Sequence, residues 1–255
     1  MDKYIYFSLA IFSILVVSCN KETISEPLVS TNLTFNFNAF IGSSPLVYNV
    51  EGMSVNNVPY KVSKFRFYLS KPRLLNENGD TLMLTFLDSG SVALKNNVHL
   101  VDFELPYSQQ IRFKVLPIKY KGIIFNIGVP NELNHVNASV MDFPLNTDAD
   151  MYWAWNPGYI FMKLEGKSVV NGKYSPFLYH AGNDDDYLSF PINEAFTVGS
   201  NGSTFKINVD INKFFYNKTY NNYPDLGDTL YRFANGGYPT NYMMRHGVLN
   251  NLLSF

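Results

Sequence analysis

Hydrophobic and polar residues alternate one by one along four stretches of the chain. These stretches are residues 33–37, 65–69, 111–115 and 205–209. Because successive side chains of a strand point to opposite faces of a sheet, the alternation predicts strands with one buried face and one exposed face.

Turn-forming residues separate these and other stretches. Asn78-Gly79-Asp80 predicts a hairpin that joins the segments around Leu74 and Leu82, and Asn171-Gly172 and Asn201-Gly202 predict two further turns. The chain lacks the regular succession of a strand and a long helix that an α/β fold requires. The pattern therefore predicts an all-β protein, built as a sandwich or an open barrel.

One stretch near the C-terminus has helical spacing instead. Met244, Val248 and Leu252 fall at positions i, i+4 and i+8, which predicts a short helix with one apolar stripe. Gly247 lowers the helical propensity of this stretch. No shift in composition divides residues 31–255, so we expect them to form a single domain.

The composition supports a folded, β-rich domain and argues against nucleic-acid binding. Hydrophobic residues make up 46% of the chain and charged residues 16%, which is too little charge for a disordered protein. The 21 Phe and 18 Tyr favour pleated sheets. The formal net charge is −1, whereas nucleic-acid binding needs a dense positive field. We therefore expect no nucleic-acid partner.

The N-terminal residues predict an export signal. Residues 1–18 combine a basic start with an apolar run shorter than the roughly 20 residues of a membrane-spanning helix. The run ends at Val16-Val17-Ser18-Cys19, which resembles a bacterial lipobox. We expect cleavage before Cys19, lipidation of its thiol, and a polar tether over residues 19–30. The protein would then be a lipid-anchored envelope protein of the outer membrane, on its periplasmic or its surface side.

Local motifs for catalysis are missing from the sequence. It contains no Gly-rich phosphate loop, no GxSxG elbow and no HExxH pair. Once Cys19 is lipidated, no thiolate nucleophile is left either. We therefore expect a binding protein and not an enzyme.

The four histidines are the candidate metal ligands, and their spacing excludes a local metal clip. His99 precedes apolar residues of a predicted strand and His246 lies on the predicted helix, so we expect both to have packing roles. His135 lies in a turn-rich loop. His180 stands just before Ala181-Gly182, where a glycine lets another group approach closely. His180, followed by His135, is the strongest candidate.

Trp153 and Trp155 are the only tryptophans of the chain and stand two residues apart. In an extended segment, both would point to the same face. Such a pair is a packed aromatic cluster, a stacking platform for a sugar, or a neighbour of a metal site.

The segment that contains these tryptophans resembles a known family. Residues 151–166 read MYWAWNPGYIFMKLEG, and FLYHAG follows at residues 177–182. Both are similar to motifs of the MbnP-like family, copper-binding envelope proteins named after a methanobactin operon and abundant as lipoproteins in Bacteroidota. Shorter similarities follow the family's order between residues 65 and 215, so the resemblance covers nearly the whole mature chain.

The resemblance implies an antiparallel β-sandwich that binds copper, as Cu(I) or Cu(II). It also implies a di-haem peroxidase-like partner enzyme that oxidises one tryptophan to kynurenine. An indole N–H can only donate a hydrogen bond, whereas an opened ring exposes an aryl amine and a carbonyl. Two imidazoles and such a nitrogen suit a low-coordinate copper site. The expected ligands are His180 and His135, with Trp155 or Trp153 as the modified residue.

Three consecutive carboxylates, Asp184, Asp185 and Asp186, follow His180. A calcium loop needs a longer series of alternating oxygen ligands, so we expect a solvated loop. In a copper site, Asp184 or Asp186 would hold the second ring nitrogen of a ligating imidazole.

Other functions stay open on the sequence alone. The aromatic-rich loops also suit a surface adhesion module, a β-sandwich that binds a glycan or a protein without metal. An oxidoreductase that uses bound copper is a third interpretation, but no segment supplies a substrate pocket for it. The copper hypothesis requires His135 and His180 to converge from separate parts of the fold.

Overall fold

The computed structural model describes residues 28–156, 158–215, 225–230 and 232–255. The predicted signal peptide, the lipidation site at Cys19 and most of the predicted tether lie outside the described residues. In these ranges, no helix combines the length and the apolar character needed to cross a membrane.

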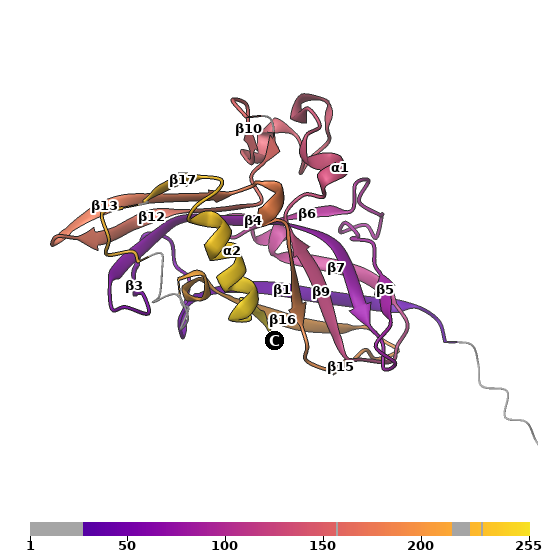
Figure 1. Cartoon of the computed structure of the whole chain (residues 1–255). Helices are drawn as coiled ribbons and strands as arrows, with labels where there is room; N and C mark the ends of the chain where they lie inside the picture. Colours follow the sequence, from indigo (N-terminus) through magenta and orange to yellow (C-terminus); the bar gives the residue numbers. More distant parts are fainter. Residues whose placement is uncertain (1–27, 157, 216–224, 231) are drawn as a thin grey trace, which may run out of the picture.

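The described strands form a sandwich of two larger sheets (Figure 1). The first sheet has the order β18-β16-β1-β2, with β7 also paired to β1. Its strands are β1 (Thr31–Ile41), β2 (Ser44–Pro45), β7 (Gln110–Val115), β16 (Ser203–Asp210) and β18 (Leu253–Ser254).

The second sheet has the order β14-β9-β4-β12-β13-β17, and the long strand β4 also pairs with β3, β5 and β6. Its strands are β3 (Glu51–Met53), β4 (Pro59–Leu75), β5 (Thr81–Met83), β6 (Val98–Asp102), β9 (Gly122–Ile127), β12 (Met162–Val170), β13 (Lys173–Ala181), β14 (Leu188–Ile192) and β17 (Phe233–Asn235). In Figure 1, β1 and β16 run beneath β4 and β12.

The remaining elements are short. Two strand pairs, β8 (Lys119–Tyr120) with β15 (Phe196–Thr197) and β10 (Tyr152–Trp153) with β11 (Gly158–Tyr159), lie outside the two sheets. The α-helices are α1 (Asn131–Asn134) and α2 (Thr240–Leu249). The 3₁₀ turns are η1 (Pro106–Gln109), η2 (Ala138–Val140), η3 (Thr147–Ala149), η4 (Asp184–Asp186) and η5 (Ile211–Phe214).

The predicted strands and turns are confirmed. The four alternating stretches lie in β1, β4, β7 and β16. Leu74 pairs with Leu82 in the β4–β5 hairpin. Asn171 and Gly172, both with positive φ, form the tight turn between β12 and β13, which is the conformation that such a two-residue hairpin loop favours.

The antiparallel sandwich is confirmed, but two strand pairs are parallel. β1 pairs in parallel with β16 from Leu33–Ser203 to Phe40–Asp210, and β13 pairs in parallel with β17. Parallel neighbours need a long connection, and most of the chain lies between β1 and β16. Alternation within one strand carries no information about such a distant partner.

The main core fills the space between the two sheets with aromatic rings. Phe35 and Phe37 of β1 are buried and face Phe125 of β9, with ring centroids 6.4 and 6.2 Å from it. Phe37 also meets Phe67 of β4 at 6.1 Å. Edge-to-face rings at these separations add about 0.5–1.5 kcal/mol per pair beyond area burial, so these contacts hold the two sheets together.

The predicted C-terminal helix is confirmed as α2, which packs against β13 and β14. Met243 and Met244 are fully buried, whereas Leu252 lies beyond the helix end and joins the core from there. A Cβ on Gly247 would lie 3.1 Å from the Phe190 ring of β14. The glycine that lowers helical propensity therefore lets the helix approach the sheet closely.

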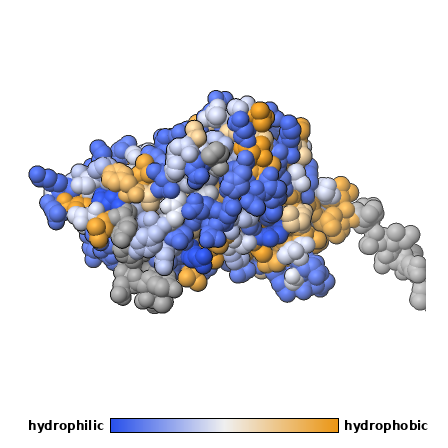
Figure 2. Space-filling model, turned by 45° about the horizontal axis from the view of Figure 1, so that its top comes forward, coloured by the Kyte–Doolittle hydropathy of each residue, from blue (hydrophilic) through white to orange (hydrophobic). Residues whose placement is uncertain are grey.

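The apolar residues are mostly internal. Figure 2 shows a face that is largely hydrophilic, with hydrophobic residues in small, scattered groups. Single exposed apolar residues are normal on a soluble surface, so this face gives no indication of a large apolar docking site.

Candidate functional site

Between β9 and β12, the chain leaves the sheet and folds over the outer face of the second sheet. This excursion, residues 128–161, carries α1 and β10, which stand above the sheet in Figure 1. It encloses a second apolar cluster of buried residues that includes Tyr68 of β4, Met151, Trp153 and Phe161. The tryptophan motif is therefore part of a small core of its own, separate from the main core between the sheets.

Two buried cations attach this excursion to the sheet. Arg66 of β4 donates through Nη1 to the carbonyl oxygen of Ala149 at 3.1 Å. Lys163 of β12 donates to the carbonyl oxygen of Asp150, and its Nζ lies 2.9 Å from Asp150 Oδ2. Burial alone would raise the pKa of Asp150. The ammonium groups of Lys163 and Lys64, which both contact this carboxylate, lower it instead.

Trp153 is the central side chain of the candidate site. It is 5% exposed, and its Nε1 has no hydrogen-bond partner among the described residues. A Cβ on Gly182 would lie 2.7 Å from two carbons of its ring, so the indole packs directly onto the glycine. The close approach predicted at Gly182 is thus made by Trp153.

Trp155 is close to Trp153 but differs from it in exposure. The two rings have centroids 5.8 Å apart, while Trp155 is 68% exposed. The segment is extended only over β10 and then turns, so the two side chains have different environments. The two rings are in contact, but they do not lie in one shared environment on the same face, as the sequence had predicted.

His135 follows α1 and lines a pocket of about 240 Å³ together with Asn134, Trp153, Gly182 and Asp184. Its Nε2 lies 3.4 Å from Asp184 Oδ1. Asn134 is buried and fixes both sides of the pocket: its Nδ2 donates to Asp184 Oδ1 at 2.9 Å, and its Oδ1 accepts the Tyr159 amide at 2.8 Å. The structure thus brings together His135, Asp184 and Trp153.

His180 lies at the end of β13 and does not line this pocket. Its Nε2 donates to Glu165 Oε1 of β12 at 2.8 Å, and this hydrogen bond lowers the pKa of the Glu165 carboxyl. Since Tyr179 and Ala181 face the main core, His180 and Gly182 share the outer face, about 7 Å apart along the strand. His180 therefore adjoins the pocket without entering it.

His99 and His246 have the packing environments expected of them. His99 donates through Nε2 to the carbonyl oxygen of Ser108 at 2.7 Å, and burial lowers its pKa to about 4. His246 is buried on α2 with Nδ1 3.2 Å from the Phe214 carbonyl oxygen, and burial lowers its pKa.

The prediction of a solvated loop for the three carboxylates is wrong for Asp186. Asp184 and Asp185 are exposed, but Asp186 is fully buried in η4. Its Oδ2 accepts the amides of Gly182 and Asn183 at 3.0 and 3.1 Å, which shapes the pocket wall. Asp184, and not Asp186, lies beside a histidine ring. Nothing in the sequence distinguishes three adjacent aspartates, because their roles depend on the turn that they form.

Asp186 makes the stability of this wall depend on pH. Burial raises its pKa from 3.8 to about 6, so the folded state holds the proton more tightly than the unfolded state. Its contribution to the free energy of unfolding is therefore largest below pH 4 and falls as pH rises through about 6. The loss is up to about 3 kcal/mol, since one pKa unit corresponds to about 1.4 kcal/mol.

Asp186→Asn should remove this dependence, because the amide keeps an acceptor for the two backbone N–H groups and does not ionise. We expect the stability of the variant relative to wild type to increase between about pH 4 and pH 7.5. Urea denaturation across that range measures the difference. Parallel curves for the two proteins would contradict the assignment.

Several residues that build the site could not be recognised in the sequence. Arg66 and Lys163 occupy outward positions of alternating strands, where charged residues are usually solvated, and Asn134 and Glu165 stand in no recognisable motif. All four act on partners at least 13 positions away. Only the arrangement of the fold reveals them.

The site has the donors of a low-coordinate metal site but not of a closed one. In the part of the chain that the structure describes, no three His, Cys, Asp or Glu side chains gather as a metal-binding group. Each of the two candidate histidines, however, has a carboxylate beside Nε2, Asp184 for His135 and Glu165 for His180. Metal-ligating histidines commonly have such a carboxylate at one ring nitrogen while the other nitrogen binds the ion. Imidazole nitrogens with carboxylates beside them fit an ion that accepts few ligands.

Comparisons with known proteins agree with the observed fold. The solved structure of MbnP from Methylosinus trichosporium superposes with a TM-score of 0.54 and 13% sequence identity, over 82% of each chain. At this identity, the likeness shows a shared fold only. A search of curated proteins finds no match. The family profile of MbnP matches residues 30–229, most of the chain, and the chain therefore belongs to the MbnP family.

Proposed function

We propose that this protein is an envelope lipoprotein that binds copper for capture, storage or handover. The observation that carries the proposal is the shared pocket of His135 and Trp153, which joins the loop and the tryptophan motif of an MbnP family member. The role is one of binding and not of catalysis. The lipid on Cys19 would hold the protein at the outer membrane.

The proposed ligands are His135 and His180, each through a ring nitrogen. Asp184 and Glu165 would hold the opposite ring nitrogens and fix the orientation of the imidazoles. Neutral imidazoles suit copper in both oxidation states, and no thiolate is needed. His180 lies beside the pocket and would have to reach the ion from there. Its role as a ligand is therefore the part of the proposal that the binding experiment tests most strictly.

A tryptophan is the proposed third component. Trp153 lines the pocket and its Nε1 is buried without a partner, so oxidation to kynurenine would place an amine and a carbonyl at the copper site. Trp155 is the more accessible of the two rings for a partner enzyme of the di-haem peroxidase type. The intact mass of protein purified from its native host distinguishes an unmodified chain from an oxidised and a lipidated one.

Copper content is the test of the proposal. Protein purified from copper-supplemented cells should carry about one copper per chain, and His135→Ala and His180→Ala should each lose most of it. Asp184→Asn and Glu165→Gln should keep the ion but weaken its affinity by about 10- to 100-fold. Asp185→Asn is the matched control, because this neighbouring carboxylate is exposed and lies outside the pocket.

Two outcomes would contradict the proposal. One is wild-type protein with less than about a tenth of a copper per chain, since binding of functional affinity fills the site. The other is copper that both histidine variants retain in full, because the ion would then lie elsewhere.

A further inference from the structure

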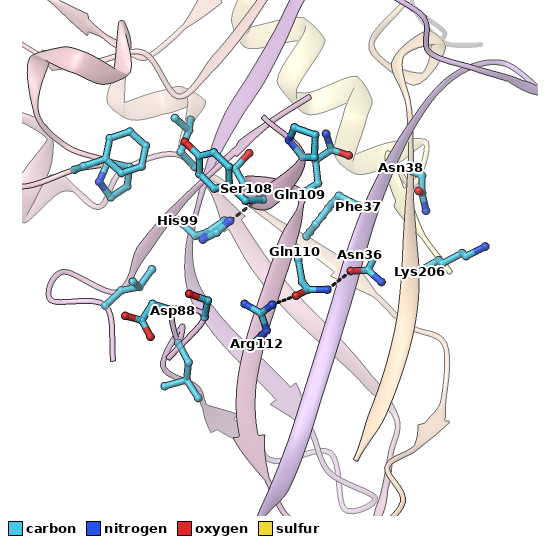
Figure 3. A pocket seen from close by; sticks show the side chains of 18 residues that line it. Asn36, Phe37, Asn38, Asp88, His99, Ser108, Gln109, Gln110, Arg112 and Lys206 are labelled. Atoms are coloured by element: carbon cyan, nitrogen blue, oxygen red, sulfur yellow. Dashed lines mark hydrogen bonds between the residues drawn. The ribbon is translucent and has the colours of Figure 1, made fainter. Parts of the chain in front are cut away.

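A groove over the first sheet shares no lining residue with the candidate copper pocket. Its larger part has a volume of about 620 Å³ and is shown in Figure 3. A second hollow of about 420 Å³ shares Asn38, Gln109 and Lys206 with it, so the two lie side by side. Together they form an open, elongated groove across the outer face of β1, β7 and β16.

Side-chain amides form the floor of this groove. Arg112 donates to the Gln110 side chain, and Gln110 Nε2 donates to Asn36 Oδ1 at 2.8 Å, which gives one line of polar groups across β7 and β1 (Figure 3). Each amide offers a donor and an acceptor, as does each hydroxyl of a sugar. The line is held in place by its own hydrogen bonds, so little side-chain entropy is lost when a ligand binds.

Two aromatic rings at the wall of the larger hollow are exposed, whereas the two at the smaller hollow also pack against the main core. Tyr107 of η1 is 69% exposed and Phe143 of the excursion is 51% exposed, and both line the larger hollow. Phe103 and Tyr48 line the smaller one. Exposed rings beside polar groups suit a ligand with alternating apolar and hydroxylated surfaces, which is the character of a pyranose ring.

The charge of the groove selects among such ligands. Arg112 and Lys206 line it together with one carboxylate, Asp88, so its charged side chains sum to +1. Burial lowers the pKa of His99, at the groove wall, to about 4, so this ring adds no charge at neutral pH. A ligand with carboxylate or sulfate groups is therefore favoured over a neutral one.

We propose that this groove binds an acidic oligosaccharide chain. An extended peptide fits less well, because β1 pairs with β7 as far as Asn36 and the Ala39 carbonyl oxygen accepts the Leu46 amide, which leaves only Phe37 and Asn38 as strand edge. A lipid chain fits less well, because the hydrogen-bonded side chains of Arg112, Gln110 and Asn36 cross the floor. The groove does not share a lining residue with the pocket of His135, so this activity is independent of copper binding.

Calorimetric titration of the purified full-length protein tests the proposal with four probes: a galacturonate hexasaccharide, a chondroitin sulfate hexasaccharide, maltohexaose and a hexaglutamate peptide. We expect one or both acidic saccharides to bind with a Kd below about 1 mM, and maltohexaose at least about tenfold more weakly. Added salt should weaken the acidic complex.

Tyr107→Ala, Gln110→Ala and Lys206→Ala should each weaken that binding about tenfold. Phe233→Ala and Lys114→Ala are the matched controls: Phe233 is exposed on β17 of the other sheet, Lys114 is exposed on β7, and neither lines the groove. Thermal unfolding of each variant verifies that it is folded. The proposal is overturned if neither acidic saccharide binds, if maltohexaose or hexaglutamate binds as tightly, or if the control variants lose binding equally.

Discussion

Gly182→Ala should destabilise the protein by about 3 kcal/mol and separate the tryptophan motif from the sheet, because overpacking typically costs about 1–3 kcal/mol and this site is closed. The added Cβ would lie 2.4 Å from the Tyr159 carbonyl oxygen and 2.7 Å from two ring carbons of Trp153. The carbonyl belongs to the backbone of β11, and the indole is enclosed by the second apolar cluster, so neither can move aside cheaply.

The loss should be seen both in stability and at the candidate site. Urea denaturation measures the free energy of unfolding, and tryptophan fluorescence of the folded variant should shift toward that of an exposed indole as Trp153 is displaced. Gly199→Ala is the control, since a Cβ there would meet its nearest atoms at 3.6 and 3.9 Å, which is ordinary contact. Equal stability of the Gly182 and Gly199 variants would show that the packing of Trp153 onto the strand end is not as close as described.

Arg66→Met should cost about 3–5 kcal/mol, because it leaves a buried carboxylate without its counter-charge. Arg66 Nη2 lies 3.0 Å from Asp102 Oδ2, and Asp102 is almost fully buried. The same guanidinium holds Glu104 at 2.8 Å and the Ala149 carbonyl oxygen at 3.1 Å. The substitution therefore weakens both the pairing of β4 with β6 and the attachment of the tryptophan excursion.

A double variant and an exposed pair show whether burial is the cause. Adding Asp102→Asn to Arg66→Met removes the unpaired charge and should recover a large part of the stability. Lys95→Met breaks an ion pair of the same 3.0 Å length with Asp142, but both partners are exposed, so the loss should stay below about 1 kcal/mol. The measurement is again denaturation in urea. Equal losses for the Arg66 and Lys95 variants would contradict the assignment.

The sequence was sufficient for the regular parts of the fold. Alternation in β1, β4, β7 and β16 and the turn residues at Gly79 and Gly172 are local signals, and each depends on neighbours a few positions away. The parallel pairing of β1 with β16 was beyond reach, because it depends on how the whole chain returns to its first strand.

The candidate residues of the site could be selected from the sequence, but their contacts could not. The tryptophans, His180 and His135 could be selected by residue type and motif, and their role as a copper site stays a prediction. The buried state of Asp186, the attachment by Arg66 and Lys163, and the carboxylate beside each histidine depend on contacts between remote segments. Such contacts leave no periodic pattern in a single sequence.

The central claim is that copper binds under the tryptophan excursion, beside His135. Diffraction from crystals soaked with a cuprous salt, recorded at the copper absorption edge, tests it most directly. The account predicts one strong anomalous peak within bonding distance of a His135 ring nitrogen, about 2 Å, in the pocket that Trp153 lines. A map with no peak there, or with its only peak beside His99 or His246, would contradict the account.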